Sequence, residues 1–210
     1  MGNSPTLSWY SLKALRAEAR AFVVLTLAVL ITSSVPVLAQ TDPYLMGNSR
    51  FGQWYIGEEA QVAVAEAKSR FGTFQSFDVR LNLNPPQTAL AHFWSADGFR
   101  LVVFQDKVIQ VMIWRRYRRV SGKWQLIQDK NAVLAQFRTP EGIRVGEGLT
   151  SVTAAYGAPD YQKRRDWGEP FINTLLVWYD RGLLIEISTP DSAVDGLGIS
   201  DPAIARQQYR

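Results

Sequence analysis

The chain has 210 residues, of which 47% are hydrophobic and 20% charged, and its net charge is +4. It contains one histidine and no cysteine, which excludes disulfides, a thiol nucleophile and a metal site built from several histidine or cysteine ligands. Because the net charge is small, any attraction to a polyanion must come from a local patch of basic residues.

Residues 1–39 have the three-part layout of a secretory signal peptide. Three basic residues precede an apolar run at 21–31, and we expect cleavage after Ala39. The run is shorter than the roughly 20 residues that a membrane-spanning helix needs. We therefore expect export to the periplasm or the exterior, with an uncleaved N-terminal membrane anchor as the alternative.

Residues 40–50 contain Asp-Pro and Gly-Asn pairs, which predict a flexible leader. Two segments with the same order of predicted elements follow, at 51–113 and at 139–210. Matched glycines in the two segments lie 84 to 89 residues apart. This regularity indicates an internal repeat.

In the first repeat, Ala60, Val64, Ala67 and Phe71 fall on one face of a predicted helix that ends at Gly72. A stretch of irregular composition follows at residues 82–88. Two apolar runs, 101–104 and 108–113, flank a short polar turn and predict an antiparallel hairpin.

In the second repeat, a short helix is predicted to end at Tyr156, with Gly157 as its cap. An irregular stretch at 162–174 precedes two predicted strands at 175–179 and 183–187, and a final strand begins near Val194. The expected fold class is α+β, with two tandem repeats, each of one or two short helices packed on a three- to four-stranded antiparallel sheet.

The second repeat resembles the small helix-plus-sheet units of bacterial envelope proteins. The resemblance rests on the segments 142–146, 156–160 and 177–183, which read Gly-Ile-Arg-Val-Gly, Tyr-Gly-Ala-Pro-Asp and Val-Trp-Tyr-Asp-Arg-Gly-Leu. The family meant includes the SmpA/OmlA lipoproteins, also called BamE, and the tandem beta-lactamase inhibitor protein. This resemblance implies two helix-on-sheet units and an occupation in binding rather than catalysis. The chain lacks the lipid-anchoring cysteine and the disulfides expected of those relatives.

A basic and aromatic segment, 114–138, connects the two repeats and carries a hairpin signal at 120–124. Arginine combined with tryptophan and tyrosine is typical of binding hot spots and of cation-π contacts. Strand alternation predicts basic side chains on both faces of 114–119, which favours a protruding edge or hairpin. An edge strand protected from aggregation by its charges is the alternative. The candidate binding residues are Trp114, Arg115, Arg116, Tyr117, Arg118, Arg119, Lys123 and Trp124.

Two other features offer weaker functional hypotheses. The second basic cluster, 163–165, is interpreted as a charged surface loop, although loops can carry function. His92 could act as a lone acid or base in a hydrolase, but we favour a packed or half-exposed histidine.

The leading hypothesis is an exported envelope protein that acts as a non-catalytic protein-binding or assembly-support module. The partner is expected to be another envelope protein. The alternative is a protein that binds a polyanion, such as lipopolysaccharide, anionic lipid or glycan, through the same residues. We expect no cofactor, no catalytic residue and no nucleic acid partner.

Overall fold

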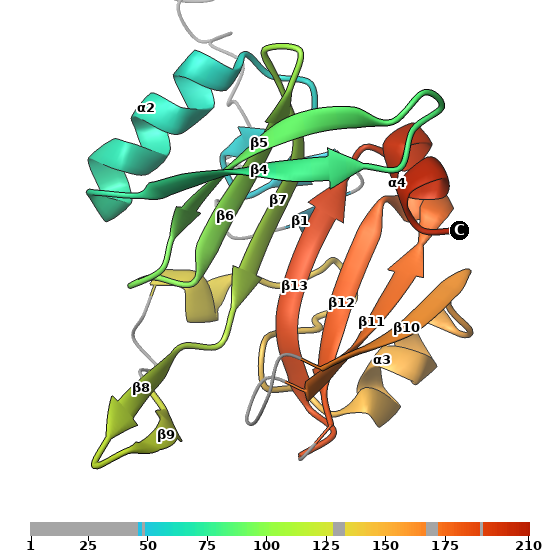
Figure 1. Cartoon of the computed structure of the whole chain (residues 1–210). Helices are drawn as coiled ribbons and strands as arrows, with labels where there is room; N and C mark the ends of the chain where they lie inside the picture. The colour runs from blue at the N-terminus through green and yellow to red at the C-terminus, as the bar shows by residue number, and fades with distance from the viewer. Residues whose placement is uncertain (1–45, 48, 128–132, 167–171, 190) are drawn as a thin grey trace, which may run out of the picture. The chain divides into compact units, whose positions relative to one another are not determined.

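The computed structural model describes residues 46–47, 49–127, 133–166, 172–189 and 191–210 (Figure 1). The predicted signal peptide at 1–39 lies outside the described residues. In the part of the chain that is described, no helix combines the length and apolar character needed to cross a membrane.

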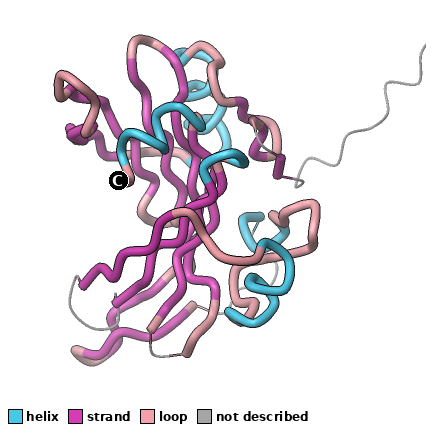
Figure 2. Tube along the Cα trace, turned by 90° about the vertical axis from the view of Figure 1, so that its right-hand side faces the viewer, coloured by secondary structure: helices cyan, strands magenta, loops and turns pink. Residues whose placement is uncertain are grey.

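The main element is one antiparallel sheet of eight strands. From edge to edge its strands are β10 (Tyr161–Asp166), β11 (Ile172–Trp178), β12 (Leu183–Ser188), β13 (Val194–Ser200), β7 (Lys107–Trp114), β6 (Phe99–Phe104), β5 (Gln87–Trp94) and β4 (Gln75–Leu81). Figure 2 shows these strands in magenta along the Cα trace.

Two small sheets accompany it. The first consists of β1 (Met46–Gly47), β2 (Arg50–Phe51) and β3 (Trp54–Tyr55), and the second is the hairpin of β8 (Tyr117–Val120) and β9 (Lys123–Leu126). The helices are α2 (Ala60–Phe71), α3 (Leu149–Tyr156) and α4 (Pro202–Gln208), with 3-10 turns η1 (Val133–Gln136) and η2 (Tyr179–Arg181).

The predicted arrangement of two tandem helix-on-sheet repeats is wrong. Strand β13 pairs with β7 in an antiparallel register from Gly196 opposite Trp114 to Ser200 opposite Gln110. This pairing joins all eight strands into one curled sheet, so neither segment has a sheet of its own. The sequence similarity between the two segments indicates which helices and strands form locally. It does not indicate which strands pair with each other.

Several local predictions are confirmed. Helix α2 ends before Gly72, whose φ of 78° lies in the left-handed region, and its backbone N–H donates to the carbonyl of Lys68 at 2.8 Å. Helix α3 likewise ends before Gly157. The hairpins β6–β7, β11–β12 and β8–β9 form where apolar or turn signals predicted them.

Other segments differ from their prediction. Strand β1 and the first residue of β2 lie within the segment 40–50, which was predicted to be a flexible leader, and Met46 in β1 is buried. Strand β10 occupies the start of the stretch 162–174, and β5 begins at Gln87 within the stretch 82–88. Strands β4 and β10 are the edges of the sheet, and their mostly exposed, polar side chains hide the alternation that reveals a strand.

The two faces of the sheet carry different cores. One face packs against α2 and α3, in a cluster that includes Trp54, Phe99, Ala67 and Val152. The rings of Trp54 and Phe99 lie 4.5 Å apart between centroids. The opposite face carries two smaller clusters, to which α4 contributes Ile204 and Ala205. Helix α4 covers only part of this second face. The candidate site lies on the same face.

Candidate functional site

An open cleft of about 670 Å³ lies on the sheet face opposite α2 and α3. We call it the aromatic cleft. Its aromatic lining is Phe77, Phe93, Trp114, Tyr117 and Trp124. Its charged and amide lining is Arg100, Arg115, Arg116, Arg165, Asn173, Glu186 and Asp195.

Trp114 lines the aromatic cleft, and its partner on the neighbouring strand β13 is Gly196, which has no side chain. Its ring lies against Gly196, where an added Cβ would approach the indole Cδ1 to 2.7 Å. The indole Nε1 therefore reaches across β13 and donates a hydrogen bond of 2.9 Å to Glu186 Oε2 on β12. Phe93 meets the Trp114 ring edge-on, with centroids 6.2 Å apart.

The floor of the aromatic cleft contains two buried carboxylates held by several donors. Arg165 Nη1 lies 2.9 Å from Glu186 Oε1. The Asn173 amide donates to Glu186 at 3.2 Å and to Asp195 at 3.0 Å, and the Tyr117 hydroxyl donates to Asp195 at 2.7 Å. Burial raises the pKa of Asp195 even though these hydrogen bonds lower it. The carboxylates are thus fixed in position by neighbouring side chains.

Arg100 is a partly buried cation with mainly neutral contacts. Its Nη2 donates to Gln110 Oε1 at 2.8 Å, and its guanidinium carbon lies 4.7 Å from the centre of the Trp114 ring. The Nε atom is buried and has no hydrogen-bond partner among the described residues. Burial is the main cause that lowers the pKa of Arg100.

A second cleft, of about 430 Å³, adjoins the first. We call it the basic cleft. It shares Arg100 and Arg165 with the aromatic cleft. Lys163, Arg164, Asp166, Gln208 and Tyr209 are among its other lining residues. The cluster 163–165, interpreted from sequence as a surface loop, is part of edge strand β10. Its Arg165 lines the aromatic cleft.

The structure divides the predicted binding residues. Five of them line the aromatic cleft: Trp114, Arg115, Arg116, Tyr117 and Trp124. Arg118 and Lys123 are exposed on the β8–β9 hairpin and line neither cleft, and the Arg119 side chain lies outside the described residues. The segment 114–119 is not one continuous strand, because β7 ends at Trp114 and β8 begins at Tyr117 as the first arm of the β8–β9 hairpin.

Sequence reasoning missed Phe77, Phe93, Arg100, Asn173, Glu186 and Asp195 as site residues. One signal for them was present. Glu186 interrupts the apolar run of β12, and Gly196 and Gly198 alternate along β13 where side chains of β7 need space. A carboxylate in an apolar strand and glycines at every second position both indicate a crowded, polar sheet face.

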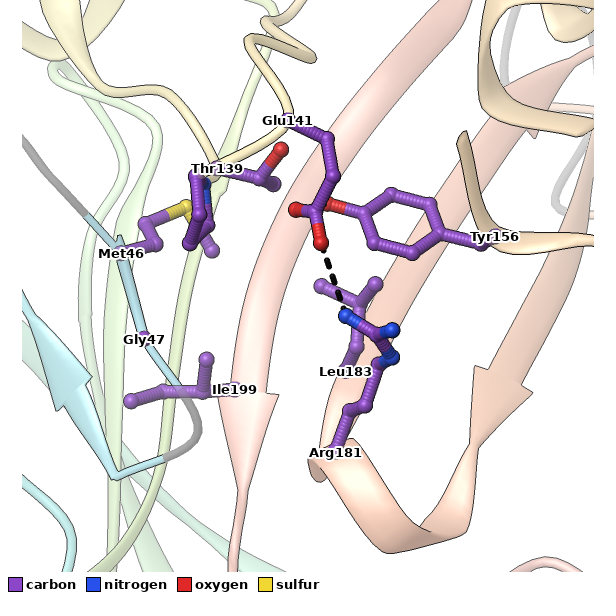
Figure 3. A pocket seen from close by; sticks show the side chains of 9 residues that line it. Met46, Gly47, Thr139, Glu141, Tyr156, Arg181, Leu183 and Ile199 are labelled. Atoms are coloured by element: carbon purple, nitrogen blue, oxygen red, sulfur yellow. Dashed lines mark hydrogen bonds and ion pairs between the residues drawn. The ribbon is translucent and has the colours of Figure 1, made fainter. Parts of the chain in front are cut away.

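Two further features are less suited to ligand binding. Figure 3 shows residues that line a small pocket, among them Glu141, Tyr156 and Arg181, with the ion pair of Glu141 and Arg181 marked. Tyr156 donates a hydrogen bond to Glu141, and the pocket has a volume of about 30 Å³. Its size matches a water molecule rather than a substrate. His92 contacts Ser76 Oγ at 2.9 Å and the ring of Phe74, and no hydrogen bond joins it to a carboxylate among the described residues. Burial lowers the pKa of His92.

Within the described ranges, no group of three or more histidine, aspartate or glutamate side chains could hold a metal ion. No family model and no curated protein matches the sequence. Among solved structures, a cysteine-rich secretory protein from Staphylococcus aureus is similar over 76% of this chain, with 8% identity and a TM-score of 0.35. The match spans 49% of that protein, and a likeness at this level carries no argument about fold or function.

Proposed function

We propose that this protein is a non-catalytic binding module of the cell envelope that grips a protein partner in the aromatic cleft. The observation that supports the proposal most is the composition and exposure of this cleft. Phe77 and Trp124 are each 44% exposed at the cleft, and Trp114 and Arg100 lie deeper in it. Exposed aromatic side chains next to arginine are the typical anchors of protein interfaces.

The polar floor supports binding rather than catalysis. Glu186 and Asp195 accept hydrogen bonds from Trp114, Asn173 and Tyr117, so their oxygens are already engaged. A general base needs an oxygen directed at a substrate proton. The proposed location in the envelope rests on the signal-peptide pattern at 1–39.

The test compares capture of envelope proteins by the wild type and by a Trp124→Ala, Phe77→Ala double variant. A Val62→Ala variant is the matched control, because Val62 is 60% exposed on α2, away from the cleft. We expect the double variant alone to lose a discrete partner that the wild type retains at high salt, where exposed charge attraction is screened. Equal retention by the folded double variant would exclude the aromatic cleft as the binding site.

A further inference from the structure

We propose that Arg100 and Arg165 bind a carboxylate of the partner, so that the segment entering the aromatic cleft carries an acidic residue beside its apolar ones. The two arginines form the wall that the aromatic cleft shares with the basic cleft. This inference rests on the proposed function and adds the chemistry of the partner.

Arg100 makes no direct hydrogen bond to an anion among the described residues, although the nearby carboxylate of Glu186 acts on it through space. Its contacts are the Gln110 amide oxygen, the Met112 sulfur at 3.5 Å and the face of Trp114, all of them uncharged. Its buried Nε has no partner among the described residues. The Nε is enclosed by protein atoms and Nη2 already donates to Gln110, so a ligand oxygen would bind Arg100 at Nη1.

The surrounding charges favour the same ligand. The residues that line the basic cleft include the cations Arg100, Lys163 and Arg165. Arg164 and Asp166 line it as well, but strand alternation directs their side chains to the opposite face of β10. Arg165 uses Nη1 for Glu186, which leaves its other guanidinium N–H groups for a ligand. Two neighbouring guanidinium groups can hold the two oxygens of a carboxylate through charge-assisted hydrogen bonds.

A protein carboxylate fits this wall better than a lipid phosphate. The arginines lie next to Phe93 and Trp114, which would contact apolar side chains flanking an acidic residue. We therefore assign the anion to an aspartate or glutamate of the partner.

The test follows the Nε–Hε signal of Arg100 by NMR in the full-length protein. The probe is N-acetylglutamate α-amide, and its isosteric control is N-acetylglutamine α-amide. We expect the glutamate compound to shift the Arg100 signal and to bind about tenfold more tightly than the glutamine compound, as charge-assisted hydrogen bonds predict. Equal affinity of the two compounds, or no shift at millimolar concentrations, would overturn the proposal.

Variants test the two arginines. Arg100→Met should abolish the preference for the glutamate compound, and Arg144→Met, at an exposed position that lines neither cleft, should retain it. Arg165→Gln, which keeps Arg100, should reduce the preference several-fold and provides the test if Arg100→Met does not fold. A preference that persists in folded Arg100→Met would also overturn the proposal.

Two further experiments are needed. One distinguishes a carboxylate from a phosphate as the ligand, and the other distinguishes failure of the anion site from failure of the proposed protein-binding function. Binding of methyl phosphate or of phosphatidylglycerol vesicles through Arg100, without a preference between the amino-acid compounds, would assign the site to phosphate instead. Partner capture that depends on Trp124 but is unaffected by Arg100→Met would leave the proposed function standing and overturn the acidic anchor. Carboxylate binding without any Trp124-dependent partner would support the anion site and contradict the protein-binding function.

Discussion

Trp114 on β7 donates a hydrogen bond of 2.9 Å to Glu186 on β12, although strand β13 lies between them. Gly196 makes this contact possible, because it pairs with Glu186 on one side and with Trp114 on the other. An indole ring thus spans the strand that joins the two halves of the sheet. The contact ties the folding of the sheet to the formation of the aromatic cleft.

A Gly196→Ala substitution should destabilise the protein by about 2–4 kcal/mol, because overpacking and the loss of a buried hydrogen bond act together. The new Cβ would lie 2.7 Å from Cδ1 and 2.8 Å from Nε1 of Trp114, so the ring must move away from Glu186. Urea unfolding measures the change. Gly47→Ala is the control, since a Cβ at Gly47 meets no atom within 4 Å, and it should leave stability almost unchanged.

A Trp114→Phe substitution keeps an aromatic ring over Gly196 but removes the donor to Glu186. We expect a loss of about 1–2 kcal/mol in the free energy of unfolding, typical of a buried hydrogen bond. A double-mutant cycle with Glu186→Ala, which removes the acceptor, checks the cause. A coupling energy near zero would show that the two side chains do not depend on each other.

The local elements of this fold could be predicted from the sequence, but the pairing of its strands could not. Helix α2 and hairpin β6–β7 have apolar residues at helical or strand spacing and a glycine or polar turn at their ends. The β13–β7 pairing depends on contacts between residues far apart in the chain. The sign of this pairing in the sequence is the pair Gly196 and Gly198. A Cβ at either position would collide with Trp114 or Met112 of β7.

For the same reason, the sequence indicates only some residues of the candidate site. Trp114 and Tyr117 stood out because arginine and aromatic residues are adjacent in the sequence there. Arg100 and Glu186 lie singly within apolar strands, and only the sheet brings them to the Trp114 ring. Composition can identify a cluster along the chain, but it cannot identify one that is assembled from residues on different strands, such as Arg100 on β6 and Glu186 on β12.

Stability should fall at acidic pH through Glu141. Burial raises the pKa of Glu141, but the hydrogen bonds from Tyr156 and Arg181 outweigh it, so the folded pKa lies below the ordinary value of 4.5. The stabilisation is therefore complete above the unfolded pKa and is lost as pH falls through the folded pKa. Urea unfolding at several pH values should show a shallower acid loss in Glu141→Gln than in the wild type.

Tyr156→Phe provides the matched test of this network. It removes the hydroxyl that lies 2.5 Å from Glu141 and retains the ring beneath Arg181. The folded pKa of Glu141 should rise towards its ordinary value, so the acid loss of stability should be smaller than in the wild type and complete at a higher pH. An unchanged pH profile would assign the lowered pKa to Arg181 and the backbone hydrogen bond instead.

Arg100 and Arg165 should differ in what they contribute to stability, although both are proposed to bind the partner. Arg100→Met should leave the free energy of unfolding unchanged or raise it by about 1–2 kcal/mol, because apolar side chains often replace buried charges without loss. Arg165→Met should instead destabilise by about 1–3 kcal/mol, because it leaves the buried carboxylate of Glu186 without its cation. Urea unfolding of both variants measures the contrast. A large fall in the free energy of unfolding of Arg100→Met would indicate that Arg100 stabilises the fold by packing on Trp114. A stable Arg100→Met variant that no longer distinguishes the glutamate compound from the glutamine compound would show that Arg100 serves binding rather than folding.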